Sequence, residues 1–505
     1  MGLYAAAHLR VKAWDKALAN VERAQTEQLL ALVRHARDTE FGRAHGFREI
    51  RGYDDYRRRV PVGDYDSFST CFDRMRRGER NIVVPEFVEH FGNSSGSTNQ
   101  HKVKYLPITD RQVDYQRGNG GDALSRYLVK NDVRDFTDGF VMNLVPPLTM
   151  RQEGPIKVTC NPALMAANLP ATTKAVYLPD RPTMCMTDYD AKLDRIADRY
   201  LDYDIRMVTG TTCWFSLLFD KLLAAARRRG HTAESVSDLW PNLNVFFGGG
   251  VAAAPYMPVI RERMGHDVQL IDTYNATEGG VYASTAFEAG LEGMMMIPHR
   301  GVFFEFVPIE QHGQPNARRV PLWEVETGQN YVILITNASG MYSYELGDLV
   351  RFTSTAPHAV EFAGRLQGCL STTQELTTHV EVQNAFDAAL NVAPSTVIDY
   401  GVGADIGIDG DSKSRYVVFA EFSGDRRPAS PEAFIDAFDD GLCQENRVYR
   451  EHRQNDTAIL APELVMLPTG SVKRFMEEAG SGSVQTKFPR ILDDRRKQIL
   501  RGYAA

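Results

Sequence analysis

The sequence predicts an α/β fold with a large N-terminal domain and a smaller C-terminal domain. Three observations favour this class. The chain has 505 residues, of which 43% are hydrophobic and 24% charged, so it is long enough for more than one domain core. From about residue 140 onward, short apolar runs alternate with segments whose apolar residues recur at helical spacing. Glycines follow some of these runs, as they do at the strand ends of α/β sheets.

Composition and charge exclude several classes of partner. The net charge of −8 gives no general attraction to nucleic acid or to an anionic membrane. We find no stretch near the roughly 20 apolar residues that a membrane span needs, and no signal peptide. The six cysteines include no CxxC pair, which argues against a zinc site. We therefore expect a cytoplasmic protein with reduced cysteines and no nucleic-acid or membrane partner.

The first two thirds of the chain alternate between helical and strand patterns. Residues 11–36 carry apolar positions at helical spacing, and a second helical pattern covers residues 214–226. Residues 245–247 and 268–271 are short buried-strand candidates on either side of a helical segment at 251–264. This strand–helix–strand order predicts a partly parallel mixed sheet whose two faces are covered by helices.

The later part of the chain predicts two further structures. Apolar runs at 331–335 and 349–352 indicate strands of an antiparallel or barrel-like subdomain. After Arg365 the chain passes through a polar, Thr-rich stretch, followed by a helix candidate at 380–390 and a strand candidate at 416–422. We therefore predict an N-terminal domain of residues 1–365 and a smaller, mobile α+β C-terminal domain of residues 366–505.

A small hydroxyl-rich loop is the first candidate for chemistry. Its hydroxyls and backbone N–H groups could wrap phosphate oxygens, with glycine permitting the close approach and a lysine neutralising charge. The alternative is an ordinary surface turn, which such Ser/Gly/Asn runs usually form. The loop residues are Ser94, Ser95, Gly96, Ser97 and Thr98, followed by Lys102 and Lys104.

A second group of candidates surrounds the strand at 268–271. The glycine triplet 248–250 ends a strand, where Gly249 and Gly250 would let the backbone approach a planar base. Tyr274 offers an aromatic face for stacking, although a lone Tyr after a strand is more often part of a core. Glu278, next to Thr277 in a Gly-flanked turn, could hold Mg²⁺, which prefers hard oxygen ligands. Asp348 could accept both hydroxyls of a ribose, or be a turn residue.

Taken together, these motifs resemble those of the plant auxin-responsive acyl-acid amido synthetases and their bacterial relatives, a branch of the adenylate-forming superfamily. The resemblance covers nearly the whole chain. Toward the N-terminus it includes Thr39-Glu40-Phe41-Gly42 and Val60-Pro61-Val62. Toward the C-terminus it includes Gln485-Thr486-Lys487-Phe488-Pro489-Arg490, which distinguishes this branch from acyl-CoA ligases.

The resemblance implies roles for individual residues. The hydroxyl loop matches the family's phosphate loop, and Lys104 matches its terminal lysine. Two departures stand out: Asn99-Gln100 replaces expected glycine, which leaves the choice between Lys102 and Lys104 open, and Glu345 stands where the family usually shows a basic residue. The implied catalytic residues are Lys104, Glu278 and Lys487, with Glu278 as the metal ligand. The implied nucleotide-binding residues are Ser94, Ser95, Gly96, Ser97, Thr98, Gly249, Gly250, Tyr274, Thr277, Asp348 and Arg365.

The expected activity is that of an ATP- and Mg²⁺-dependent ligase. A carboxylic acid would be activated as an acyl-adenylate and then joined to an amine or amino acid, with the C-terminal domain rotating between the half-reactions. Arg117, Thr212 and Trp214 are candidate acyl-substrate residues, against the commoner fates of surface charge and ordinary core. Two alternatives remain open: an acyl-CoA ligase of the same superfamily, and a catalytically degenerate nucleotide-binding protein.

Overall fold

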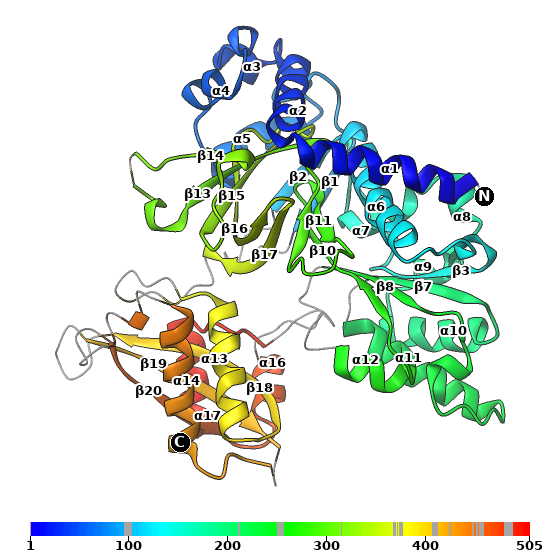
Figure 1. Ribbon diagram of the computed structural model, residues 1–505, viewed down its shortest axis with the longest axis vertical. Coiled ribbons are helices and arrows are strands. Elements are labelled where there is room, and N and C mark those ends of the chain that lie inside the picture. Colours follow the sequence, from blue (N-terminus) through cyan, green and yellow to red (C-terminus); the bar gives the residue numbers. More distant parts are fainter. Residues whose placement is uncertain are drawn as a thin grey trace. The chain divides into compact units, whose positions relative to one another are not determined.

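The chain folds into two compact units in a computed structural model (Figure 1). The first comprises Met1–Leu346 and Val350–Phe362, and the second comprises Gly347–Leu349 and Ala363–Ala505. The structure describes residues 2–94, 104–210, 213–249, 257–314, 316–366, 370, 372, 377–406, 413–423, 426–446, 449–450, 453, 459–478 and 488–504.

A five-stranded parallel sheet forms one part of the first unit, as the alternating apolar pattern predicts. Its residues alternate between two apolar layers. Met207 and Val245 pack toward α6 (Asp110–Lys130), whereas Val208 and Phe246 pack against α10 (Tyr189–Tyr200), α11 (Cys213–Arg228) and α12 (Met257–Met264). Helices therefore cover both faces (Figure 1). In spatial order the strands are β6 (Tyr177–Leu178), β3 (Phe140–Leu144), β7 (Ile205–Gly210), β8 (Val245–Gly248) and β9 (Gln269–Ile271).

Most of the helices predicted for this unit are confirmed, with one correction. The helical pattern at 11–36 is two helices, α1 (Gly2–Ala19) and α2 (Val21–Ala36). The break lies at Asn20, whose side chain caps α2 by accepting a hydrogen bond from the Arg23 backbone N–H. The segment at 214–226 is α11 (Cys213–Arg228), and the second half of the segment at 251–264 is α12 (Met257–Met264). Residues 251–256 lie outside the described part of the chain.

The subdomain predicted as antiparallel or barrel-like is an eight-stranded sheet. Its neighbours pair antiparallel at β10–β11, β11–β12, β12–β17 and β13–β15. In order the strands are β10 (Thr273–Ala276), β11 (Gly280–Thr285), β12 (Met294–Met296), β17 (His358–Arg365), β16 (Tyr344–Thr355), β15 (Asn330–Asn337), β13 (Val302–Pro308) and β14 (Val320–Pro321).

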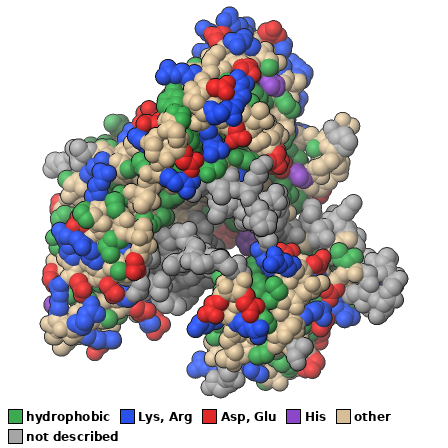
Figure 2. Space-filling model, turned by 180° about the vertical axis from the view of Figure 1, so that it is seen from behind, with side chains coloured by type: hydrophobic (Ala, Val, Ile, Leu, Met, Phe, Trp, Pro, Cys, Tyr) green, Lys and Arg blue, Asp and Glu red, His purple; other side chains and the backbone are tan. Residues whose placement is uncertain are grey.

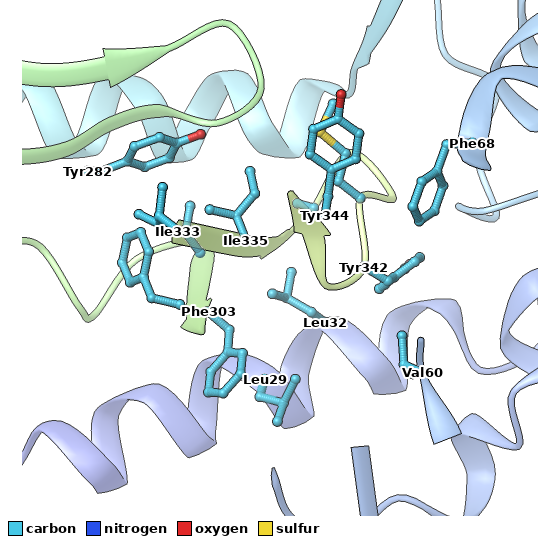
Figure 3. Packing of buried hydrophobic residues seen from close by; sticks show 14 of the residues in the cluster. Leu29, Leu32, Val60, Phe68, Tyr282, Phe303, Ile333, Ile335, Tyr342 and Tyr344 are labelled. Atoms are coloured by element: carbon cyan, nitrogen blue, oxygen red, sulfur yellow. The ribbon is translucent and has the colours of Figure 1, made fainter. Parts of the chain in front are cut away.

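The largest apolar core of the first unit lies between this sheet and α2. Leu29 and Leu32 of α2 face Phe303, Ile333 and Ile335 of the sheet, and all five side chains are nearly inaccessible to solvent (Figure 3). Their apolar spacing along α2 explains why the sequence pattern identifies this helix.

A small four-stranded sheet and several helices complete the first unit. In the sheet, β1 pairs antiparallel with β2 and parallel with β5. Its order is β2 (Lys104–Ile108), β1 (His90–Ser94), β5 (Ile156–Thr159) and β4 (Arg151–Glu153). The helices are α3 (Glu40–Ala44), α4 (Tyr53–Arg59), α5 (Tyr65–Arg76), α6 (Asp110–Lys130), α7 (Asn161–Ala167), α8 (Ala171–Lys174), α9 (Arg181–Met184) and α10 (Tyr189–Tyr200).

The second unit is an α+β structure with a core of its own. Its three-stranded sheet has the order β18 (Val397–Ile406), β19 (Ser414–Phe422) and β20 (Ile459–Leu467). One face packs against α13 (His379–Val392) and α14 (Pro431–Glu445), and the other against α16 (Ser471–Glu478) and α17 (Asp494–Ala504). The predicted helix at 380–390 and strand at 416–422 are therefore confirmed as α13 and β19.

Charges of both signs are interspersed on the surface shown in Figure 2. In α4, the consecutive Arg57 and Arg58 pair with Asp54 and Asp55 one turn earlier, so even this basic run is locally compensated. Among the described residues, we find no helix whose length and apolar character would suit it to crossing a bilayer.

Candidate active site

The candidate phosphate loop connects the two strands of a hairpin. Ser94, the last residue of β1, pairs in register with Lys104, the first residue of β2. The intervening Ser95, Gly96, Ser97, Thr98 and Lys102 lie outside the described residues. The register therefore places Lys104 where the loop returns to the sheet, next to the strand from which the loop departs.

Lys104 is held over an aromatic ring at this position. Its Nζ lies 5.6 Å from the centroid of the Tyr65 ring, and the Tyr105 backbone N–H donates to the Tyr65 hydroxyl at 3.0 Å. The pKa of nearby Asp64 is lowered overall. Burial alone would raise it, but hydrogen bonds from Ser67 and the charge of Lys104 outweigh that effect. Lys104 is thus a cation placed by packing at the mouth of the loop.

The turn that carries Thr277 and Glu278 is fixed from two sides. It joins β10 to β11, and Gln112 of α6 donates through Nε2 to the Gly279 carbonyl at 2.8 Å. Asn337, at the end of β15, donates through Nδ2 to the Glu278 carbonyl at 2.5 Å. Gly280 has φ of +86°, and a Cβ there would lie 2.3 Å from Gln116 Cγ. The glycine in this motif is therefore required both by backbone conformation and by space.

The phosphate hairpin and the Glu278 turn touch one another. A Cβ on Gly92 of β1 would lie 2.7 Å from Thr277 Cγ2, closer than two carbon atoms can pack. Glu278 in turn lies near the buried Tyr344 ring: burial raises the pKa of the Tyr344 hydroxyl, and the charge of Glu278 raises it further. Two motifs separated by some 180 residues are therefore brought together by β1 and β10 (Figure 1).

Gly249 lies at the carboxyl end of the parallel sheet, against the start of β10. The Thr273 hydroxyl donates to the Gly248 carbonyl at 2.7 Å and accepts from Asn275 Nδ2 at 3.0 Å. A Cβ on Gly249 would lie 2.3 Å from that same Nδ2. Gly250 and Thr212 lie outside the described residues, and Trp214 falls in the first turn of α11.

Tyr274 belongs to the large apolar core of the first unit. Its ring is 6% exposed and packs against Tyr282, with centroids 5.4 Å apart, and against Phe362 at 6.0 Å. The described contacts are those of a core residue, and a base-stacking role for this ring stays a prediction.

Asp272 is a functional candidate that the motif analysis missed. It follows the last residue of β9 and precedes Thr273, so it lies at the carboxyl edge of the parallel sheet beside the Gly249 position. The Thr273 backbone N–H donates to its Oδ1 at 2.9 Å, while burial raises the pKa of the carboxyl to about 6. A carboxylate directly after an apolar strand was the available signal.

Asp348 and Arg365 form an ion pair in the second unit. The Arg365 Nε lies 3.0 Å from Asp348 Oδ1, and Asp348 is 4% exposed. The departure at Glu345 is also explained locally, because its carboxylate lies 2.9 Å from His312 Nε2 and raises the pKa of that imidazole. Glu345 is thus paired with an imidazole of this chain's own.

Two predicted residues are still to be accounted for, Arg117 and Lys487. Arg117 projects from α6, where Nη1 donates to the Asn168 carbonyl at 2.8 Å and Nη2 pairs with Asp114. Its side chain is about a third exposed, and a substrate role for it stays a prediction. Lys487 lies outside the described residues.

Three family models match successive parts of this chain. They are described as the GH3 family N-terminal domain, central domain and C-terminal domain, and they match residues 10–163, 294–365 and 378–496. The chain belongs to the GH3 family. These matches cover most of its length, including the phosphate hairpin and Asp348.

Curated GH3 relatives are similar over part or most of this chain. Jasmonoyl–L-amino acid synthetase JAR6 of Nicotiana attenuata is 27% identical over 56% of this chain and 50% of that protein. Indole-3-acetic acid-amido synthetase GH3.3 of Arabidopsis thaliana is 23% identical over 94% of this chain and 90% of that protein. The chain thus spans about half the length of the first relatives it matches.

Solved structures show the same fold. The GH3.15 acyl acid amido synthetase superposes with a TM-score of 0.73 at 18% identity, covering 96% of this chain and 94% of that one. A 2-hydroxyisobutyryl-CoA ligase in the postadenylation state superposes with a TM-score of 0.60 at 15% identity, covering 96% and 91%. The GH3 member described here therefore has the fold of adenylate-forming enzymes.

Proposed function

We propose that this GH3 protein is an ATP-dependent acyl-acid amido synthetase, which activates a carboxylic acid as an acyl-adenylate and joins it to an amine or amino acid. The observation that carries the proposal is the contact between the Gly92 strand and Thr277, because it brings the hairpin of the proposed phosphate loop against the turn that carries Glu278. The activities of the GH3 relatives, as their names give them, support the same reaction class.

In the first half-reaction the acid's carboxylate oxygen attacks the α-phosphorus of ATP. The bond from that phosphorus to the oxygen bridging to the β-phosphorus breaks, and pyrophosphate leaves. Lys104 at the mouth of the loop would neutralise charge on the phosphates, with Ser94 to Thr98 supplying donors. The chain's contribution is mainly positioning and charge neutralisation.

Glu278 fits the coordination chemistry of magnesium. Its carboxylate offers hard oxygen ligands in a turn that Gln112 and Asn337 hold still. Within the described part of the chain, no three His, Cys, Asp or Glu side chains converge as a metal cage. A single carboxylate suits Mg²⁺, which takes its other ligands from phosphates and water and, when bound, offsets phosphate charge.

The nucleotide's base and sugar are assigned to three carboxylate or aromatic groups. Tyr274 would contact adenine, with Gly249 and Gly250 allowing the base to approach the backbone. Asp272 at the same edge would accept a hydrogen bond from the adenine amino group, because a carboxylate oxygen accepts and an amino group donates. Asp348, beside Arg365, would accept the ribose hydroxyls.

In the second half-reaction a neutral amine nitrogen attacks the acyl carbon. The bond from that carbon to the phosphate oxygen breaks, AMP leaves, and the nitrogen loses a proton to give the amide. Arg117, Thr212 and Trp214 remain the proposed acyl-substrate residues, and Lys487 with reorientation of residues 366–505 remains the proposed basis of the second step. Cytoplasmic location is likewise part of the proposal.

Two coupled assays test this function. Acid-dependent ATP–pyrophosphate exchange with a panel of aryl and alkyl acids should first reveal the activated acid. That acid, with ATP, Mg²⁺ and a set of amino acids, should then give an amide and AMP by mass spectrometry. Thioester formation with CoA and no amide would favour the acyl-CoA ligase, and ATP binding without any exchange would favour a degenerate binding protein.

A further inference from the structure

A buried lysine lies at the same sheet edge as the candidate site but outside every motif described above. Lys192 of α10 is 0% exposed. It sits beside the carboxyl end of β3, whereas Gly249 and Asp272 follow β8 and β9 of the same parallel sheet. Because neighbouring strands are about 4.8 Å apart, β3 ends roughly 10 Å from the end of β8.

The Lys192 ammonium ties together three segments at that edge. Its Nζ donates to the Val145 carbonyl at 2.8 Å and to the Met184 carbonyl at 3.2 Å. Val145 begins the loop after β3, and Met184 is the last residue of α9. The Met184 carbonyl also accepts from the Leu148 backbone N–H at 3.1 Å, and Cys185 Sγ donates to the Leu148 carbonyl at 3.7 Å.

Burying a lysine at this position costs stability, which points to a functional reason for keeping it. Burial lowers the pKa of Lys192 to about 8, which means that the folded protein disfavours the charge. The titratable groups that face it are the thiols of Cys185, which follows α9, and Cys160, which precedes α7. The nearby cation on α10, Arg195, donates to the Thr183 hydroxyl at 2.9 Å. An apolar side chain would fill the same space without the desolvation cost.

The position of the loop after β3, which Lys192 holds, indicates what that function is. Ligands of parallel α/β sheets bind outside the carboxyl ends of the strands. With the nucleotide's base at the β8 and β9 ends, an acyl group would extend across the end of β7 toward β3. The loop at 145–150 is then the far wall of the acyl site, and its backbone is what Lys192 holds.

We propose that Lys192 is a positioning residue of the acyl site, whose ammonium fixes the loop after β3 and thereby sets affinity for the acid substrate but not for ATP. The inference rests on the proposed function. It assigns specificity for the acid to a wall formed by backbone and apolar side chains, with no direct contact between Lys192 and the substrate.

The test compares Lys192→Met, Lys192→Arg and a matched control, Lys221→Met, which alters a partly exposed lysine paired with Asp194. With the activated acid, Lys192→Met should raise the KM for the acid at least fivefold in ATP–pyrophosphate exchange, while the KM for ATP and kcat change less than twofold. In the wild type that KM should rise above about pH 8, where Lys192 loses its proton; this step should vanish in Lys192→Met and persist in Cys185→Ser.

Hydrogen exchange gives a readout that does not depend on activity. The amides of Val145, Leu148, Thr149 and Met150 should exchange faster in Lys192→Met than in the wild type, and at the wild-type rate in Lys221→Met; residues 146 and 147 are prolines without an amide hydrogen. If Lys192→Met changes neither the KM for the acid nor the hydrogen exchange of the loop, the inference is overturned. Equal rises in the KM for the acid and the KM for ATP would overturn it as well. If Lys192→Met does not fold, the wild-type pH step and Lys192→Arg decide instead. If the wild type activates no acid, the proposed function fails, and with it the acyl-site role. Hydrogen exchange in the loop after β3 still tests whether Lys192 holds that loop.

Discussion

At the scale of single residues, Asp272 combines a proposed contact with the nucleotide with a cost in stability. Burial raises its pKa from 3.8 to about 6, so between these values the folded protein holds a proton that the unfolded chain releases. Its stabilising contribution is therefore complete below about pH 4 and is lost as the pH rises through 6. At pH 7 the ionised carboxylate costs up to about 3 kcal/mol relative to a neutral group.

Asp272→Asn should consequently be more stable than the wild type at pH 7. The free energy of unfolding, measured in urea, should exceed that of the wild type by about 1–3 kcal/mol at pH 7, and the difference should shrink toward pH 4. The same variant should raise the KM for ATP if the carboxylate contacts adenine. A pH-independent difference in stability would contradict the burial argument.

Glu278 is the second residue, and its proposed role depends on one charge. Glu278→Gln keeps the shape of the side chain and leaves the backbone bond from Asn337 in place. It removes the charge of the proposed metal ligand, worth about 1.5–3 kcal/mol, so acid-dependent pyrophosphate exchange should fall at least tenfold. Glu292→Gln, at an exposed carboxylate of the same unit, is the matched control and should retain the wild-type rate.

At the scale of elements, the close approach of β8 to β10 can be tested by one added methyl group. In Gly249→Ala the new Cβ would lie 2.3 Å from Asn275 Nδ2 and 2.6 Å from Thr273 Oγ1. The Thr273 hydroxyl cannot swing away without losing its bond to the Gly248 carbonyl. We expect a loss of about 1–3 kcal/mol in unfolding free energy and a raised KM for ATP.

Gly120→Ala provides the opposite expectation in the same unit. Gly120 lies within α6, and a Cβ there would meet nothing within 4 Å. Alanine should therefore stabilise the helix by roughly 0.5–1 kcal/mol and leave catalysis as it is. Equal effects of the two substitutions on stability would show that the Gly249 contact is looser than described.

Elements with regular apolar spacing were predictable, and the contacts between them were not. The spacing of Leu29 and Leu32 identifies α2, and the apolar run ending at Ile271 identifies β9, because burial imposes these periods on the sequence. The break at Asn20 was missed because both helices continue the same apolar pattern across a single capping residue. The approach of Gly92 to Thr277 depends on packing between distant strands, which no local pattern encodes.

At the scale of the whole molecule, the division into two units predicts two separable unfolding events. Phe386 of α13 stacks on Tyr400 of β18, with centroids 3.5 Å apart, within the apolar core of the second unit. Phe246 of β8 stacks on Phe215 at 5.0 Å within a core of the first unit. Each aromatic side chain contributes to one core only, because no apolar cluster among the described residues draws on both units.

Phe386→Ala should therefore lower one calorimetric transition and Phe246→Ala the other. Emptying a buried Phe site costs about 3–5 kcal/mol, which is enough to shift a transition by several degrees in a unit of this size. A unit that unfolds independently can also reorient as a body, which an enzyme with two half-reactions requires. If either substitution lowers both transitions equally, the chain unfolds as one cooperative block, and reorientation of residues 366–505 between half-reactions loses its physical basis.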